Sequence, residues 1–340
     1  MNIQILCTLG PSSFRPDVIR ALDDRGVSLF RINLSHTPLD RVADAIRFVR
    51  EHSRTAISLD TEGAQVRCGV LAEDVELAEG QVVELTAAEE AGSARRMTLR
   101  PASIFDDLRP GATISIDFDG AVLEVVETGE GGARAAVRHP GRVKSNRAVN
   151  IDPPPELPPL TEKDFGAIEI GAGMGIVNYA LSFAGKAEHV QLLRSLVGEE
   201  AHVISKIESR VGVRNMAEII PASDAVLIDR GDLSREIPLE LVPYYQKVIA
   251  RQANRWSRPV FVATNLLESM VTNRKPTVAE ANDIANTLLD GVHGLVLAAE
   301  TAIGRDPVGS VDMVLRSIKA FERSHLSALL EEDRAPAEVL

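Results

Sequence analysis

Cysteine is scarce in this sequence: Cys7 and Cys68 are the two among 340 residues, and they form no spaced cluster. This excludes a disulfide framework and the zinc sites that clustered cysteines build. Long apolar runs are also missing, since none approaches the roughly 20 residues that a membrane helix requires. The N-terminus shows no basic region followed by a sustained apolar segment, so we expect no targeting signal and a reducing, cytoplasmic location.

Basic residues are fewer than acidic ones, 37 Lys and Arg against 49 Asp and Glu, for a formal net charge of -12. A surface of that sign disfavours nucleic acid and anionic membranes as partners, so any phosphate site must be local. Apolar residues are abundant. At 45% hydrophobic and 25% charged, the chain has the composition of a soluble protein with a core, in one large domain or two.

Short β-rich runs alternate with helix-period segments along most of the chain, which predicts an α/β fold, a closed TIM-type (β/α)8 barrel. Its active site is expected where the strands end. The strand-like runs are 3–6, 28–32, 56–59, 175–181, 202–204, 225–228, 260–263 and 294–297. The helix-like segments are 15–25, 38–52, 162–171, 187–197, 239–254, 278–290 and 308–323.

One interval, residues 68–158, breaks this rhythm with short strand-like runs separated by Gly, Asp and Glu. It reads as an inserted small all-β lid domain, and the proline-rich DPPPELPPL that follows favours an extended, semi-rigid hinge. Thr161 then caps the next helix. We therefore expect barrel segments at 1–67 and 159–325, the lid between them, and a frayed tail at 326–340.

The run VISKIE places Lys206 and Glu208 two residues apart, on the same side of a strand. A cation beside a carboxylate suits metal-assisted phosphoryl or enolate chemistry, and Asp232 after the next strand offers a second hard oxygen ligand for Mg²⁺ or Mn²⁺. The backbone around Gly231 offers amide donors to an anion. A surface salt bridge at a strand end explains the same pair equally well.

Polar residues also end the second and third strands. Arg31 and Arg67 are suited to gripping a phosphoryl group through paired hydrogen bonds. The oxygen-bearing residues nearby are suited to a cation, although each is also an ordinary polar strand end. They are Asn33, Ser35, Asp60 and Thr61. Thr264, after a later strand, either passes a proton, binds an anion or caps a helix.

Taken in order, these blocks resemble pyruvate kinase along nearly the whole chain. They are CTLGPSS, RINLSH, SLDTEG, IDFDG, LPPLTEKD, VISKIES, RGDL, ATNLLESM and LDGVHGLVLAAETA. The resemblance implies a barrel with a β-rich lid inserted after the third strand. It also implies sites for phosphoenolpyruvate or pyruvate, for ADP or ATP, for a divalent cation and for potassium.

By matching position, Glu208 and Asp232 are implied as divalent-metal ligands and Lys206 as the cation that stabilises the transferring phosphoryl group. Thr264 is implied near the methylene carbon of the substrate, and Gly231 at the substrate carboxylate. The phosphate contact is Arg31, the monovalent-ion ligands are Asn33, Ser35, Asp60 and Thr61, and the nucleotide or lid positions are Pro11, His36, Arg67, Asp119 and Arg147.

Several positions depart from the family pattern. Glu62 stands where Lys or Arg is usual, and Asp229 replaces a small residue directly before Arg-Gly-Asp. Each adds negative charge near anions, and at close range costs on the order of 1 to 4 kcal/mol unless a cation or a protonated form compensates. Ala298 and Ala299 replace Ser-Gly, which removes a hydroxyl attributed to the proton relay. Gln65 stands where potassium-dependent members carry Glu, and Arg147 where lysine is usual.

Three functions remain open from the sequence. The first is a pyruvate-kinase-like phosphotransferase, and the second is a metal-dependent lyase or enolising enzyme on a pyruvate-like 2-oxo acid. The third is a catalytically weak paralogue that binds a metabolite. The chain ends soon after the last barrel helix, so we expect the family's C-terminal regulatory domain to be absent. A homo-oligomer through the barrel is a further hypothesis.

Overall fold

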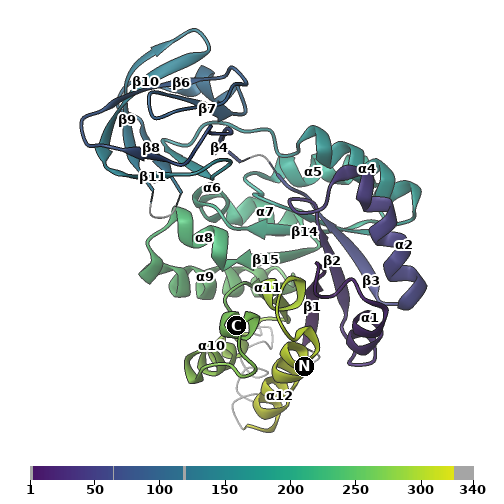
Figure 1. The fold of residues 1–340 in the computed structure, drawn as a ribbon. Helices are drawn as coiled ribbons and strands as arrows, with labels where there is room; N and C mark the ends of the chain where they lie inside the picture. The colour runs from purple at the N-terminus through teal and green to yellow at the C-terminus, as the bar shows by residue number, and fades with distance from the viewer. Residues whose placement is uncertain (1–2, 64, 118–119, 325–340) are drawn as a thin grey trace, which may run out of the picture. The chain divides into compact units, whose positions relative to one another are not determined.

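The computed structural model describes residues 3–63, 65–117 and 120–324, so the expected tail at 326–340 lies outside the described residues. Eight parallel strands close into a barrel in the order β1-β17-β16-β15-β14-β13-β3-β2 (Figure 1). The predicted fold class is confirmed. The strands are β1(Gln4–Thr8), β2(Leu29–Asn33), β3(Ala56–Asp60), β13(Asn178–Leu181), β14(His202–Ile207), β15(Ala225–Asp229), β16(Val260–Ala263) and β17(Gly294–Leu297).

Alternation along each strand divides the apolar residues between two cores. In β15, Ala225 and Leu227 belong to a small cluster contributed by strands alone, whereas Val226 and Ile228 join the larger cluster that includes the helices. The small cluster therefore fills the inside of the barrel, and the larger one holds the helices against its outside. Both sets are fully buried, which explains the near-continuous apolar runs in the sequence.

Helices connect successive strands, and most begin and end within a few residues of the predicted bounds. They are α1(Pro16–Asp23), η1(Leu39–Arg41), α2(Val42–His52), α4(Glu162–Gly173), α5(Ala187–Val197), α6(Arg210–Arg214), α7(Met216–Ala222), α8(Arg230–Glu236), η2(Leu239–Leu241), α9(Val242–Arg255), η3(Glu268–Val271), α10(Val278–Leu289), α11(Ala299–Ala302) and α12(Pro307–Arg323). The short ones, α8 and α11 among them, escaped prediction because they span too few turns to show a period.

The strand predicted from residue 175 was wrong over its first three positions. Gly175 has a φ of 69° and lies in the turn after α4, where Ile176 N donates to Gly171 O. That left-handed residue ends the helix, and the strand β13 begins at Asn178. Thr161 caps the same helix as predicted, since its hydroxyl accepts from Asp164 N.

Residues 64–158 form a second compact unit with its own core, separate from the barrel unit of residues 1–63 and 159–340. A seven-stranded sheet runs β12-β8-β9-β10-β6-β7-β4, and β11 pairs with β5. Its elements are β4(Arg67–Cys68), β5(Val75–Leu77), β6(Val82–Thr86), β7(Arg96–Arg100), α3(Ile104–Asp107), β8(Thr113–Ile116), β9(Val122–Gly129), β10(Gly132–His139), β11(Gly141–Val143) and β12(Val149–Asp152).

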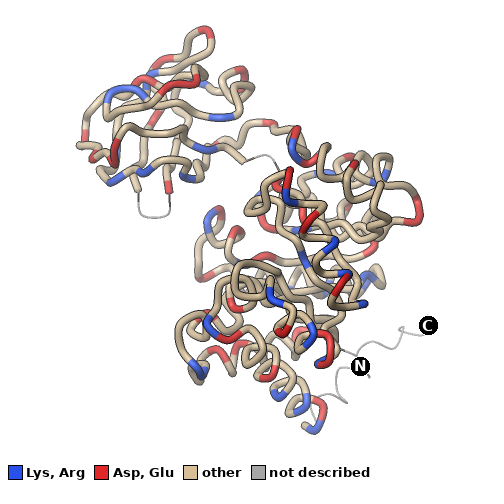
Figure 2. The backbone as a smooth tube through the Cα atoms, turned by 45° about the vertical axis from the view of Figure 1, so that its right-hand side comes forward, with Lys and Arg blue, Asp and Glu red and all other residues tan. Residues whose placement is uncertain are grey.

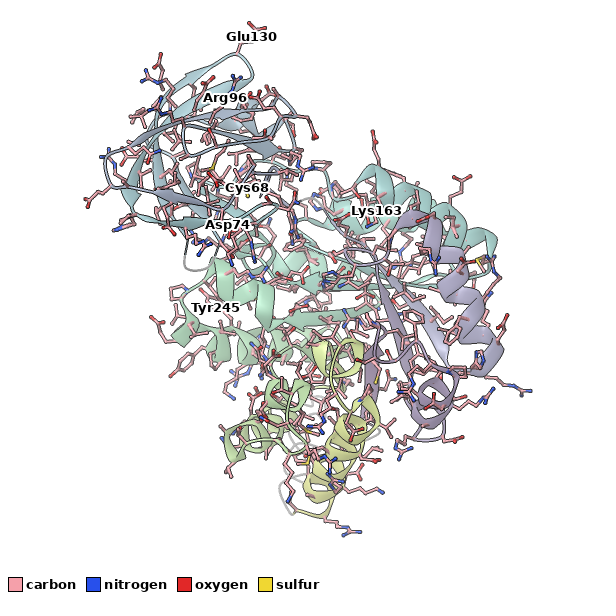
Figure 3. All side chains as sticks on the ribbon, viewed as in Figure 1. Cys68, Asp74, Arg96, Glu130, Lys163 and Tyr245 are labelled. Atoms are coloured by element: carbon pink, nitrogen blue, oxygen red, sulfur yellow. The ribbon has the colours of Figure 1, made fainter. Side chains whose placement is uncertain are left out.

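Acidic and basic residues are interspersed along both units (Figure 2). The described part of the chain contains no helix with the length and apolar character needed to cross a bilayer. The two cysteines are free and buried, Cys7 in β1 and Cys68 within the second unit (Figure 3). Burial raises the pKa of both thiols, so neither is an activated nucleophile.

Candidate active site

The inside-outside alternation of the barrel strands places the predicted site residues on the inner side, at the carboxyl ends. Arg31 follows the interior Leu29 by two positions, Lys206 follows Ile204, and Asp229 follows Leu227. Because side chains two apart share one face of a strand, the polar residues continue the interior layer where the strands end. In each of these strands, an apolar residue inside the barrel is followed two positions later by a charged residue nearer the carboxyl end.

Lys206 lies at the centre of this layer, between two carboxylates. Its Nζ is 2.9 Å from Glu208 Oε2 and 3.6 Å from Asp229 Oδ2, and it donates to Ser182 Oγ at 3.3 Å. Burial acts to lower the pKa of Lys206, but Glu208 and Asp229 outweigh it and hold that pKa above the ordinary value. Lys206 is thus a fixed buried cation, not a surface ion pair.

Glu208 is held as a buried carboxylate beside this lysine. Phe183 N donates to its Oε1 at 2.8 Å, while Oε2 accepts no well-aligned hydrogen bond from any described residue although the Lys206 ammonium is near. Burial raises the pKa of Glu208 to about 8; Asp229 and Asp232 add to the rise and Lys206 opposes it. A buried acid with an unsatisfied oxygen is suited to a cation ligand.

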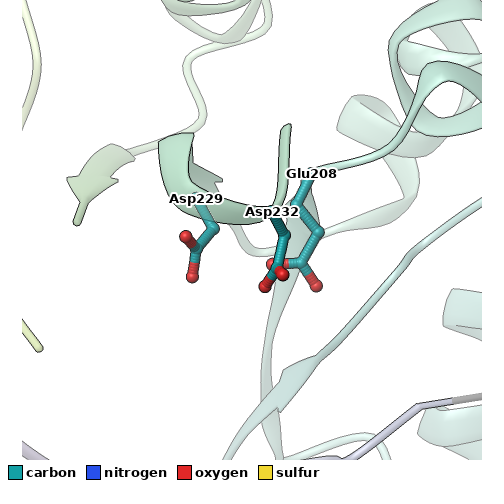
Figure 4. A group of neighbouring side chains, drawn as sticks. All are labelled: Glu208, Asp229 and Asp232. Carbon is teal, nitrogen blue, oxygen red and sulfur yellow. The ribbon is translucent and has the colours of Figure 1, made fainter. Parts of the chain in front are cut away.

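A cluster of three carboxylates forms around this oxygen: one oxygen each from Glu208, Asp229 and Asp232 lies within 4.8 Å of the others (Figure 4). Asp232, in the first turn of α8, also pairs with Arg235 at 3.0 Å. Hard oxygens at this spacing match the ligands that Mg²⁺ and Mn²⁺ prefer. With all acids ionised, the three carboxylates outnumber their two cationic partners, Lys206 and Arg235, and the net negative charge that remains is one that a divalent cation would offset.

Asp229 caps α8 and engages the groups around it. Its Oδ1 accepts from Gly231 N at 3.2 Å and from the Thr264 hydroxyl. Burial acts to raise the pKa of Asp229, but Lys206 and the Thr264 hydrogen bond outweigh it and keep that pKa below the ordinary value. The amide predicted to be open to an anion at Gly231 is therefore already bound to a carboxylate of the chain itself.

Thr264 does not cap a helix, so that alternative is wrong. It follows β16 with a φ of 75°, which is an uncommon backbone angle for a β-branched residue. Asn265, the next residue, also has a positive φ, 57°. Arg230 holds this turn, because its guanidinium donates to Thr264 O at 2.7 Å and pairs with Asp283 at 2.8 Å. Strain of this kind clusters at functional sites.

Arg31 and Asp60 form a buried ion pair between neighbouring strands, with Arg31 Nε 2.8 Å from Asp60 Oδ2. Arg31 also donates to Thr8 Oγ1 at 3.1 Å, and Ser58 Oγ donates to Asp60. Burial acts to lower the pKa of Arg31, but Asp60 outweighs it. Both residues lie in the inner layer as predicted. In this structure the guanidinium of Arg31 binds the carboxylate of Asp60, so the predicted phosphate contact and the predicted cation ligand form one ion pair.

The predicted monovalent-ion ligands come from the same two strand ends. Asn33 and Asp60 are directly paired in the β2–β3 register, and Ser35 N donates to Asn33 Oδ1 at 2.9 Å. Thr61 Oγ1 accepts from Ser182 N at 2.9 Å, and Thr61 O accepts from Ser182 Oγ at 2.6 Å. Ser182, which links this group to Lys206, was missed; its signal was a serine two positions after the interior Ala180.

The predicted nucleotide residues divide between the two units. Pro11 and His36 are exposed on loops of the barrel unit. Arg67 and Arg147 lie on adjoining segments of the second unit, where Arg67 bridges Ala148. Arg67 donates to Gln65 and Asn146, Arg147 pairs with Asp117 at 3.3 Å, and Asp119 lies outside the described residues.

Two of the departures from the family pattern have local compensation. Glu62 lies 3.7 Å from Lys163 at the start of α4 (Figure 3), and its backbone N donates to buried Asp164 at 2.6 Å. The negative charge of Asp229 is compensated by the Lys206 ammonium, 3.6 Å away. Ala298 has no side-chain hydroxyl to offer, and its N donates to Glu300 Oε2 at 2.8 Å.

This fold and site define a barrel enzyme with a lysine and carboxylate centre of the kind used for phosphoryl and enolate chemistry. The family model "Pyruvate kinase, barrel domain" matches residues 1–311. A pyruvate kinase of Thermotoga maritima is 37% identical over 333 residues, covering 95% of this chain and 71% of that protein. Pyruvate kinases of Agrobacterium vitis (36%; 96% and 70%) and Mycobacterium tuberculosis (35%; 96% and 71%) are similar as well.

The chain therefore belongs to the pyruvate kinase family, and it is a phosphotransferase of that kind. Membership implies a need for a divalent metal and for potassium. The three curated relatives differ widely in source yet align over nearly the whole chain. Nothing in these comparisons favours the lyase or the weak-paralogue alternative.

Proposed function

We propose that the protein transfers the phosphoryl group of phosphoenolpyruvate to ADP with Mg²⁺, giving pyruvate and ATP. The bond between phosphorus and the enol oxygen breaks, a bond from phosphorus to a terminal oxygen of ADP forms, and the enolate takes a proton at its methylene carbon. The single observation that supports this most is the buried Lys206, held between Glu208 and Asp229 beside Asp232.

Charge placement explains what each residue contributes. Glu208 and Asp232 would hold Mg²⁺ or Mn²⁺, which supplies Lewis-acid stabilisation of developing negative charge when bound. The Lys206 ammonium is preorganised by its carboxylate partners, so it stabilises charge on the transferring group and on the enolate without reorganisation. Gly231 and Thr264 lie against this centre beside the proposed place of a three-carbon acid, and both donate to Asp229.

The remaining assignments complete the proposed site. Arg31 faces the phosphoryl group from the inner layer, supported by Asp60. Potassium would take oxygens of Asn33, Ser35, Asp60 and Thr61. Within the barrel unit, Pro11 and His36 are the proposed nucleotide contacts. Within the second unit, Arg67 and Arg147 carry positive charges that suit phosphate.

A direct assay tests this function. Protein supplied with phosphoenolpyruvate, ADP, Mg²⁺ and K⁺ should form ATP and pyruvate in equal amounts, and omission of ADP should stop both. Lys206→Met should lower kcat by about 10² to 10³-fold, the effect of removing one preorganised electrostatic group. Lys247→Met, the same change at an exposed lysine of α9 that pairs with Asp290, should leave more activity. Absence of ATP formation at saturating substrates would contradict the proposal.

A further inference from the structure

The carboxylate of Asp229 is bound in the way that a small organic acid would be bound. Its Oδ1 accepts from the Gly231 amide at 3.2 Å and from the Thr264 hydroxyl, and its Oδ2 lies 3.6 Å from the Lys206 ammonium. An amide, a hydroxyl and an ammonium converging on two oxygens form a carboxylate site. The chain supplies the carboxylate itself.

These donors are fixed in place, so they do not turn easily to a second acid. A Cβ built on Gly231 would meet Thr264 Cγ2 at 2.8 Å, which shows how closely the two backbones approach. Arg230 clamps the Thr264 carbonyl from the other side at 2.7 Å. Lys206 is held by Glu208 as well as by Asp229. An incoming carboxylate must displace Asp229 or bind beside it.

Binding beside Asp229 is electrostatically unfavourable. Glu208, Asp229 and Asp232 already bring three acidic groups within 4.8 Å. Like charges at such range repel strongly in a buried site, so another carboxylate there is disfavoured until a divalent cation offsets this charge. The donors of Gly231 and Thr264 stay engaged by Asp229 in either case. At Arg31 the guanidinium is paired with a single carboxylate, Asp60, so the phosphoryl end of a substrate meets one acidic partner there and not a cluster of three.

We propose that Asp229 is a specificity-determining residue that occupies the donors for a substrate carboxylate, so that the site gains little from a carboxylate on its enol phosphate substrate. This inference rests on the proposed function. Phosphoenolpyruvate is then a weakly bound substrate. A simple enol phosphate such as vinyl phosphate is used about as efficiently, because it has no carboxylate for the Gly231 amide or the Thr264 hydroxyl to bind.

The test compares two phosphoryl donors in two variants. Loss of Asp229 as a Lys206 partner affects both donors, so the readout is the ratio of kcat/KM for phosphoenolpyruvate to kcat/KM for vinyl phosphate. Asp229→Ala should raise that ratio at least about tenfold, since a hydrogen bond to a charged group is worth that much. Asp229→Asn keeps an acceptor for Gly231 N and removes the charge, so it should fall between wild type and Asp229→Ala.

A matched control makes the same change at the other end of the same strand. Asp224 precedes β15 and pairs with Arg194 at 2.7 Å, so Asp224→Ala removes an acidic partner without touching the site. Its ratio of kcat/KM for the two donors should equal that of the wild type. If Asp229→Ala leaves this ratio as it is in the wild type, the inference is overturned.

Failure of the proposed function is a separate result. If no protein forms ATP from either donor, calorimetric binding with Mn²⁺ present still decides the inference. Tighter binding of phosphoenolpyruvate to Asp229→Ala, with vinyl phosphate unaffected, supports it, and equal binding to both proteins overturns it. Much weaker Mn²⁺ binding by Asp229→Ala, with no gain for phosphoenolpyruvate, would make Asp229 a metal ligand and overturn it as well.

Discussion

At the scale of single residues, metal binding at the lysine and carboxylate centre depends on the protonation state of one buried acid, Glu208. Glu208 is fully buried, one oxygen is fixed by Phe183 N, and burial raises the pKa of Glu208 to about 8. A proton and a divalent cation compete for the same carboxylate, so metal binding must release the proton below that pH. Mg²⁺ or Mn²⁺ binding without substrate is therefore expected to be pH-dependent.

We predict that the affinity for Mn²⁺ rises from pH 6 to about pH 8, by up to about tenfold per pH unit, and then levels off. The sign follows from the raised pKa of Glu208, since the anionic form is the minor one at neutral pH and grows as pH rises. Calorimetry at each pH measures it. Glu208→Gln should bind weakly and lose the slope, whereas an unchanged slope in that variant would contradict the assignment.

At the scale of elements, the opposite ends of the strands carry ordinary stabilising contacts. Asp224, just before β15, accepts from Val203 N at 2.8 Å and pairs with Arg194 at 2.7 Å. Burial acts to raise the pKa of Asp224, but the Val203 and Arg194 hydrogen bonds outweigh it and lower that pKa below 3.8. The carboxylate therefore joins the α5 helix to the β14 and β15 strands.

Asp224→Asn should lower the free energy of unfolding by about 1 to 3 kcal/mol at pH 7, as for a charged hydrogen-bonded group. Because the folded pKa is depressed, this stabilisation is present above 3.8 and is lost as pH falls through the folded pKa. Urea unfolding at several pH values measures the difference. Asp17→Asn, in an exposed pair with Arg15, should change the free energy of unfolding by at most about 1 kcal/mol.

At the scale of the whole molecule, each of the two units holds core residues of its own, and the described cores of the two units share no buried residue. One includes the barrel helices and strands, and the other lies within residues 64–158. Each unit buries its own apolar residues, so each is expected to unfold as its own cooperative unit. Calorimetry should therefore resolve two transitions, or a calorimetric enthalpy larger than the van't Hoff value.

Leu99→Ala tests this division. Leu99 is fully buried in the core of the second unit, and its loss should lower the free energy of unfolding of that unit by about 2 to 5 kcal/mol. The transition of the barrel unit should not move. Leu295→Ala, in the barrel core, is the matched change and should shift the other transition. A single transition that both variants lower equally would contradict independent units.

Much of the fold was predictable because local rules dominate it. Runs such as 260–263 and 294–297 were predicted at their observed bounds, since continuous apolar segments flanked by polar residues mark buried parallel strands. Short elements were harder. The helix α8 has seven residues, too few to show a helical period. The turn at Thr264 and Asn265 depends on positive φ angles that the residue pattern does not predict.

The sequence by itself determined the barrel and the convergence of Lys206 and Glu208, because a strand places residues two apart on one face. It also supplied the family resemblance that the comparisons confirm. Only the tertiary structure decided the partners. Asp229 meets Thr264 across 35 positions and Lys206 from the neighbouring strand, and Arg31 meets Asp60 in the same way. Such contacts follow from strand register and closure of the barrel, which join residues distant in sequence.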